Sequence, residues 1–457
     1  MMKKETICKS GKRLFSDPIY FYIVAIAGII FLHIAVHDYV RWLYADYLIF
    51  PALMFLGAAL ERKAAWKSKW NLVLPALMAA WFLLLQGKRI LVNEEIQNVG
   101  LFLFVYLFAF PLASLLQDGN EKKALKIFAG VYLAAAATLV VDTALLLTDC
   151  VPSFFVRHIF WNGARLQVFW HSNIAACFLM TGIVFCTTFF ADVSALWAKV
   201  ALIILAVLML GVMTLTNCRT IIILTGGYLG AQIFFALVKR KVKWLVPGML
   251  IVLVVTVGVF IGAKSQYQIN EAALIEQQVQ TGVDADEVKL ESASPQGTLL
   301  EDLGTLNNRT GIWAAAHRTI RENPEILLWG TTEPGAYVSD YHSYDIGHLH
   351  NAWVECLLAL GCVGFLLALL FTVVTLWNCL IILLKDHQNI WKRNVALLAL
   401  CLMGASVLEP YLFYTTFEYH LVDVLFFLCA GYLVHWQEAD NRRMLMAIRS
   451  KLSTKKK

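Results

Sequence analysis

The sequence predicts an all-α, polytopic integral membrane protein with about twelve transmembrane helices. Of its 457 residues, 59% are hydrophobic, which is far above the level of a soluble domain. Apolar runs of about 20 residues recur along the chain, and each can cross a bilayer core of roughly 30 Å. The ten cysteines fall mostly inside these runs without any Cys-x-x-Cys pair, so they are interpreted as small core residues.

The chain begins with a basic segment ahead of its first apolar run, residues 19–36. The basic residues are Lys3, Lys4, Lys9, Lys12 and Arg13, and no clear small-residue cleavage site follows them. This pattern is typical of an uncleaved membrane anchor. The positive-inside rule then predicts that the N-terminus lies in the cytoplasm.

Eleven further runs are expected to span the membrane. They cover residues 43–60, 71–86, 97–116, 125–147, 173–191, 197–216, 219–238, 244–263, 351–384, 395–414 and 420–436. The inner segments that follow from this order carry most of the 38 lysine and arginine residues. Both termini are therefore expected in the cytoplasm. The basic tail, 437–457, is expected either to lie on the anionic inner leaflet or to act only as a solvated topology signal.

One long polar segment separates the ninth and tenth predicted spans. Its first part, up to Asp302, is acidic, rich in glutamine and poor in aromatic residues, so loose helix and coil are expected there. Loops of this length are usually functional or disordered. The predicted organisation is nine N-terminal spans (1–263), an extracytoplasmic loop with short helices (264–350), three C-terminal spans (351–436) and the tail (437–457).

The end of this loop holds the first group of candidate site residues. Asn308 can cap a helix that should end before Pro324. Arg309 and Trp313 are four residues apart, so a cation and an indole share one face of this helix. A turn region punctuated by glycine and proline follows and brings the chain back to the membrane.

His350 and Asn351 lie where the loop re-enters the membrane. Asn351 can cap the new helix, and a rigid helix start would hold the imidazole of His350 in place. The alternative is that His350 only satisfies a backbone group at this junction. An arginine, an indole and a histidine thus gather just above the predicted membrane surface.

Two more arginines are predicted at the outer surface. Arg165 precedes an aromatic-rich approach to Asn173, where the sixth span begins. The alternative there is an interfacial aromatic belt with Asn173 as a helix cap. Arg219 lies in the short turn TNCRT between the seventh and eighth spans. An arginine at depth costs roughly 2.5–3.5 kcal/mol unless it snorkels to the interface or binds an anion, so snorkelling is the alternative for Arg219.

Outward arginines beside a histidine favour one class of substrate. Guanidinium groups bind phosphate oxygens in a bidentate manner that lysine cannot reproduce. Histidine can act as a base near neutral pH. The combination suits a lipid-linked pyrophosphate whose sugar is transferred outside the cytoplasm, and the sequence shows no nucleotide-binding loop and no sign of nucleic-acid binding.

Three patches along about 200 residues resemble the O-antigen ligase and O-antigen polymerase family of bacterial envelope glycosyltransferases. They are RLQVFWHSNIAA, LTNCRTIIIL and RTGIWAAAHRTIRENPEILLWGTTEPG with HLHNAWVECLLALGCVG. The plan of about twelve spans with one large outer loop also agrees. Two departures from the family pattern are Cys218, where the family often has serine, and the turn TTEPG, which has fewer glycines than usual.

The resemblance implies an undecaprenyl-diphosphate-linked glycan as the donor, a glycan or lipid-linked acceptor, and a place in the bacterial cell (inner) membrane. Arg219 and Arg309, helped by Arg165, would neutralise the departing pyrophosphate, and His350 would orient or deprotonate the acceptor hydroxyl. Two or three charge-assisted hydrogen bonds of roughly 1.5–3 kcal/mol each could supply several powers of ten in rate.

The remaining candidates for substrate binding are Asn173, Trp313, Asn351 and Glu355. Trp313 is expected to stack on a sugar or to anchor its helix, and Glu355 to pair with an arginine or to tune the site as a cavity-facing carboxylate. Acidic residues near span ends are interpreted as packing or rim residues; they are Asp142, Glu409 and Glu418.

The family resemblance implies no metal and no cofactor. A zinc site at His342, His348 and His350 with Asp340 and Asp345 is the alternative, although these residues lack a typical ligand spacing. A transporter or flippase of lipid-linked glycans is the competing function, but it should show broken or charged spans as internal repeats. Ligase and polymerase both remain open, because they share the donor and differ in the acceptor.

Overall fold

A computed structural model describes residues 70–93, 121–148, 159–162, 165–168, 172–238, 309–331, 334–341, 348–413 and 422–437, with a few single residues between them. Several predicted features lie outside these ranges. They are the spans at 19–36, 43–60 and 97–116, nearly all of the span at 244–263, the first part of the outer loop and the basic tail.

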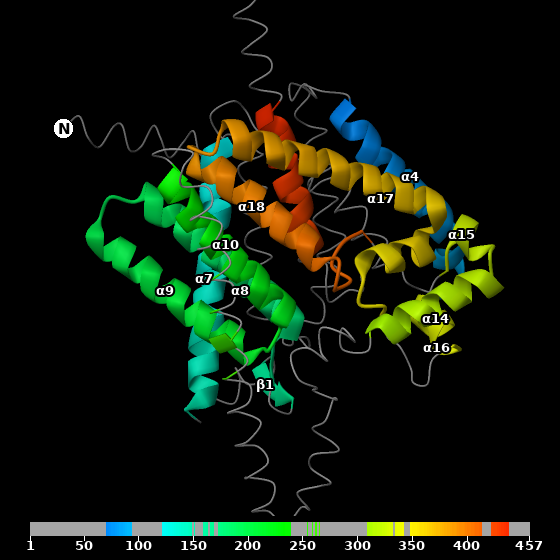
Figure 1. The fold of residues 1–457 in the computed structure, drawn as a ribbon, viewed down its shortest axis with the longest axis horizontal. Helices are drawn as coiled ribbons and strands as arrows, with labels where there is room; N and C mark the ends of the chain where they lie inside the picture. The colour runs from blue at the N-terminus through cyan, green and yellow to red at the C-terminus, as the bar shows by residue number, and fades with distance from the viewer. Residues whose placement is uncertain are drawn as a thin grey trace, which may run out of the picture.

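The described part of the chain is built almost entirely of helices (Figure 1). Five of them are long and apolar enough to cross a membrane. They are α7 (Glu121–Leu147), α8 (Ser172–Asp192), α9 (Leu196–Leu215), α10 (Arg219–Val238) and α17 (Ala352–Lys385). The predicted helical, multi-pass class is therefore confirmed, whereas the count of twelve spans stays a prediction.

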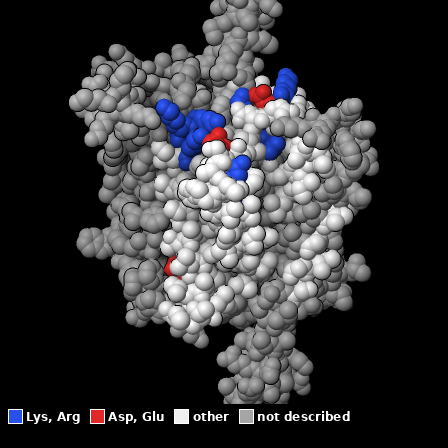
Figure 2. Space-filling model, turned by 90° about the vertical axis from the view of Figure 1, so that its left-hand side faces the viewer, with Lys and Arg blue, Asp and Glu red and all other residues white. Residues whose placement is uncertain are grey.

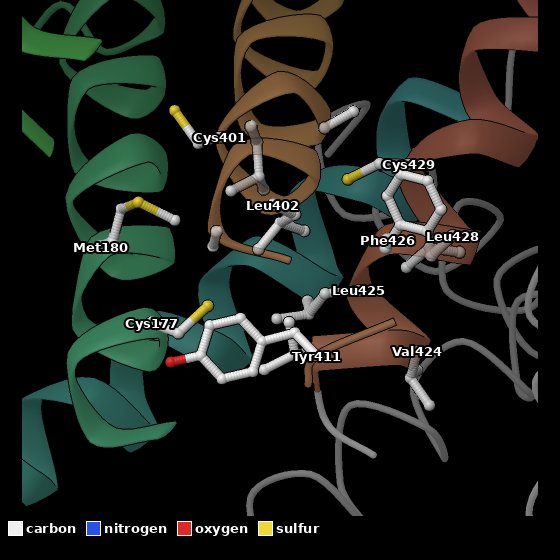
Figure 3. Packing of buried hydrophobic residues seen from close by; sticks show 14 of the residues in the cluster. Cys177, Met180, Cys401, Leu402, Tyr411, Val424, Leu425, Phe426, Leu428 and Cys429 are labelled. Carbon is white, nitrogen blue, oxygen red and sulfur yellow. The ribbon is translucent and has the colours of Figure 1, made fainter. Parts of the chain in front are cut away.

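Shorter apolar helices complete the bundle. They are the segment Ala76–Leu85 within α4 (Trp70–Asn93) and the helix Val422–Gln437, and α18 (Ile390–Ala405) packs with them in the core. Helix α8 is almost wholly buried at the centre, against α7, α9 and α18. In the core, Cys177 and Met180 of α8 point toward Cys401 and Leu402 of α18 (Figure 3). The cysteines of the described residues are all free thiols, and most of them are buried, as core residues should be.

The outward faces of α9 and α17 are apolar and exposed. On α9 this face carries Trp197, Val200, Ile204, Val207 and Leu208, spaced three or four residues apart around one side of the helix. A wide apolar face exposed in this way is the surface that lipid chains would cover. These two helices therefore lie at the periphery of the bundle.

Polar side chains gather at one end of the bundle. Figure 2 shows lysine and arginine side chains clustered there, above a mostly uncharged surface. Lys122 and Lys126 of α7 form ion pairs with Asp192 at the end of α8, and Lys392 of α18 pairs with Asp386 at 2.6 Å. All of these residues lie in or next to predicted inner segments, so the basic end agrees with the cytoplasmic side of the predicted topology.

Two predicted boundaries differ in the structure. The approach to the sixth span forms an antiparallel hairpin, β1 (Ile159–Asn162) with β2 (Arg165–Val168), in which Asn162 is paired with Arg165. The span predicted at 395–414 is instead α18, which begins after the capping residue Asn389 and ends at Ala405. Residues 406–413 form turns, because Pro410 cannot supply a helical N–H and disfavours helix at the residue before it.

Helix α17 bends at Gly361, where it meets the short helix α15 (Ile326–Trp329). Gly361 has φ 66°, and so does Gly330, which directly follows α15. The bend leaves carbonyl groups without helical partners: Thr331 N donates to Leu358 O at 2.7 Å, and Trp81 Nε1 of α4 donates to Leu360 O at 2.8 Å. The membrane helix α17 and the outer segment are thus joined tightly at one point.

Candidate active site

The outer segment places Arg309 and Trp313 on one face of α14 (Arg309–Glu322), as their spacing requires. Arg309 donates through Nη2 to the Glu409 carboxylate. One turn further on, Trp313 Nε1 donates to the carbonyl oxygen of Leu349 at 3.1 Å. The two side chains fix α14 against the segment that precedes α17. The predicted cap Asn308 lies outside the described residues, and α14 ends before Pro324 as expected.

Residues 349–351 are held from several sides. Glu355 Oε2 accepts a hydrogen bond from Leu349 N at 3.1 Å, and Asn351 Oδ1 caps α17 by accepting from Trp353 N at 2.9 Å and Val354 N at 3.0 Å. The helix cap predicted at Asn351 is therefore present. Between these anchors, His350 has φ 51°, a left-handed conformation that is uncommon for a residue with a side chain.

Glu409 joins Arg309 to His350. Its Oε1 accepts from Arg309, and its Oε2 lies 3.4 Å from His350 Nδ1. The carboxylate is buried, with 2% of its side chain exposed, whereas 31% of the His350 side chain is exposed. The interpretation of Glu409 as a packing or rim residue is therefore wrong. The only sequence signal for it was an acidic residue before a proline at the end of an apolar run.

The segment that carries Glu409 is fixed to the start of α17. Asn351 Nδ2 donates to Val407 O at 2.9 Å, and Ala352 N donates to Ser406 O at 3.0 Å. Both donors directly follow His350 in the chain. These two hydrogen bonds join the residues that follow His350 to those that precede Glu409, and they hold the two side chains near each other.

The turn between α9 and α10 lies beside this ion pair. Burial raises the pKa of the Cys218 thiol to about 12, and the nearby charge of Glu409 adds to the increase while Arg309 opposes it. Cys218 is therefore a neutral thiol next to the Arg309–Glu409 pair. Arg219, the following residue, begins α10 and is half-buried, with interactions of its own.

The other predicted site residues take different positions. Arg165 begins β2, and Asn173 is the second residue of α8, so Asn173 is not the cap of that helix. Glu355 is buried and bonds the backbone of Leu349; in the described residues it pairs with no arginine.

His348 lies against His350, with 4.3 Å between their ring centroids. His342 and Asp345 of the alternative zinc site lie outside the described ranges. Within those ranges, no three or more His, Cys, Asp or Glu residues come together as metal ligands. What the described residues do offer is an arginine, a buried carboxylate and a partly exposed imidazole in one row, which is suited to proton transfer next to an anion.

Comparison with known proteins points to the same region. No curated protein matches the chain. Residues 204–369 match the family model described as O-antigen ligase. This stretch includes Arg219, Arg309, Trp313, His350, Asn351 and Glu355, and it ends inside α17. Over these residues the chain is similar to the O-antigen ligase family, in agreement with the resemblance seen in its sequence.

Proposed function

We propose that this protein moves a saccharide from an undecaprenyl-diphosphate carrier to an acceptor hydroxyl on the outer side of a bacterial inner membrane. The match of residues 204–369 to the O-antigen ligase family model supports a glycosyltransferase of ligase or polymerase type, and the apolar helices support a multi-pass membrane protein. A lipid-linked donor is consistent with both, because such a donor is already activated and already in the membrane.

In the proposed reaction, the acceptor oxygen attacks the anomeric carbon of the donor sugar. The bond between that carbon and the phosphate oxygen breaks, and undecaprenyl diphosphate leaves with the electron pair. Nε2 of His350 takes the proton of the acceptor hydroxyl. Arg219, with Arg165, stabilises the charge that develops on the leaving pyrophosphate.

The observation that supports this proposal most strongly is the row Arg309–Glu409–His350. It joins two predicted site residues that are 41 positions apart in the chain, next to the turn that precedes Arg219. Arg309 uses Nη2 to donate to Glu409. An arginine has five N–H donors, so the remaining ones can bind the leaving group.

The other candidates support the site through its backbone. The indole N–H of Trp313, the carboxylate of Glu355 and both polar atoms of the Asn351 amide bond protein groups around His350. We propose that these three residues hold the loop in place, while the ring face of Trp313 can still pack on a sugar. Asn173 lies at the start of α8, and we propose that its side chain helps to bind the donor or the acceptor.

The experiment is a transfer assay with purified protein, a synthetic polyprenyl-diphosphate saccharide and candidate acceptors. Formation of a glycoside bond together with free polyprenyl diphosphate supports the proposal. Movement of intact donor across a liposome membrane without bond cleavage would instead indicate a flippase. In a deletion strain, single repeat units accumulating on the carrier would indicate a polymerase, and full-length unattached chains would indicate a ligase.

A further inference from the structure

We infer that Glu409 is a positioning residue that sets the proton arrangement of His350 and the place of Arg309 at once. This inference rests on the proposed function, in which His350 takes the proton of the acceptor. The region that matches the family model ends at residue 369, so Glu409 lies 40 positions beyond it. The structure alone brings this carboxylate to the site.

Geometry assigns one oxygen of Glu409 to each partner. Oε1 accepts from Arg309 Nη2, and Oε2 lies 3.4 Å from His350 Nδ1. A carboxylate can only accept, so this contact requires the imidazole proton to be on Nδ1. The neutral ring then carries its lone pair on Nε2, which is the atom that the proposed reaction needs.

The surroundings of Glu409 make it a fixed group. The whole residue is 1% exposed. The two carbonyl oxygens of Ser406 and Val407, just before it in the chain, accept hydrogen bonds from the start of α17. The ionisable groups that interact with it come from three other segments: Arg309 of α14, His350 before α17 and Cys218 before α10. His348 lies against His350, and Tyr411 lies near Cys218. Of these, Arg309 is the permanent cation that balances the buried carboxylate.

The arrangement has a consequence during the transfer step. When Nε2 receives the proton, the imidazole becomes a cation, and Glu409 lies next to it on the opposite side of the ring. A buried carboxylate in this place stabilises the imidazolium and keeps the ring from rotating. Glu409 thus acts through His350 and Arg309 and does not touch the substrate.

The first test is the variant Glu409→Gln, which keeps the size of the side chain and removes its charge. We expect kcat for saccharide transfer to fall at least about 100-fold, as is typical when a carboxylate that orients a catalytic histidine is neutralised. The KM for the polyprenyl-diphosphate donor should change much less than kcat. Glu409→Asp keeps the charge and should recover part of the rate. Glu325→Gln, at an exposed position before α15, is the control and should retain full activity.

The second test separates positioning from a merely structural role. In the double variant Glu409→Gln/His350→Gln, the residual rate should fall far less than the product of the two single losses predicts. The part of the Glu409 effect that acts through the His350 ring is already gone there, and only the part that acts through Arg309 remains. Multiplicative losses would mean that Glu409 supports the fold only, and would overturn the inference. If Glu409→Gln does not accumulate, the same cycle is measured with Glu409→Asp.

The outcomes also separate this inference from the proposed function. If His350→Gln abolishes transfer while Glu409→Gln keeps the wild-type kcat, the positioning role is wrong and the transfer function stands. If both variants keep the wild-type kcat, His350 is not the base, and the proposed reaction fails with the inference.

Discussion

At the scale of single residues, the candidate site is organised around the backbone at His350. Its left-handed conformation, φ 51°, lies between the bonded residues Leu349 and Asn351. Such conformations cost of order 1–3 kcal/mol and persist only where the surroundings hold them. The contacts of Trp313, Glu355 and Asn351 are those surroundings, so they contribute to the direction in which the imidazole points.

Arg219 provides the first prediction at this scale. The variant Arg219→Lys keeps the charge and loses the planar fork that binds phosphate oxygens in pairs. We expect a large fall in glycan transfer, of roughly 10- to 100-fold from the loss of one charge-assisted hydrogen bond of about 1.5–3 kcal/mol. The measurement is turnover in the purified system at equal amounts of protein. If Arg219 only snorkels, lysine serves equally well and the rate stays normal.

The spacing of residues along one helix could be predicted from the sequence, and contacts between distant segments could not. Arg309 and Trp313 are four apart, and both reach the segment before α17. Glu409 is distant in the sequence from both of its partners, and its apolar flanks are typical of a span end. Only the packing of residues 406–413 on the start of α17 brings its carboxylate to His350.

At the scale of elements, the crossing of α15 and α17 depends on two glycines. A Cβ atom at Gly361 would lie 2.6 Å from Leu328 O, and one at Gly330 would lie 2.1 Å from Ala359 O. Both positions also have φ 66°. Neither contact can relax easily, because the atoms that a Cβ would meet belong to the backbone. These glycines allow the outer segment to lie directly on the bend of the membrane helix.

The second prediction concerns this crossing. Gly361→Ala should destabilise the protein by more than about 1–3 kcal/mol, the cost of a side chain at a backbone conformation that essentially only glycine adopts, because the carbonyl clash adds to it. Gly130→Ala is the matched control, since a Cβ in that part of α7 meets nothing within 4 Å. Thermal unfolding of the detergent-solubilised proteins measures both. Equal melting temperatures for the two variants would contradict the tight crossing.

Element boundaries followed from the sequence where a helix is long, apolar and capped. The spans predicted at 173–191, 197–216 and 219–238 agree with α8, α9 and α10 to within two residues. The end of α18 was missed because the apolar run continues past Ala405 although the helix does not. The hairpin before α8 was missed because its strands of four residues are too short to show an alternating pattern.

At the scale of the whole molecule, the two ends of the bundle differ in chemistry. One end carries the lysine-rich ion pairs of α7, α8 and α18. From this end, α9 runs to the turn before α10, and α17 runs back to its own start beside His350. The proposed site is thus at the opposite end. If the basic end faces the cytoplasm, the site faces outward, where a lipid-linked glycan would be used.

The third prediction tests this orientation with cysteines placed at exposed positions. In a Cys150→Ser background, which removes an exposed thiol, a cysteine at Glu325 should react with a membrane-impermeant maleimide in intact cells. A cysteine at Gln388, in the turn between α17 and α18, should react only after the cells are opened. The reverse pattern would place the proposed site in the cytoplasm and exclude the proposed reaction.

The most direct test of the account is turnover by the variant His350→Gln with a purified lipid-linked donor. Glutamine retains hydrogen bonding but cannot take up a proton near neutral pH. We expect transfer to be lost while binding of the donor remains, whereas His348→Gln, which changes the neighbouring ring, should have a mild effect. A wild-type rate for His350→Gln would contradict the account, because leaving-group stabilisation by the arginines would then have to carry the catalysis without a base.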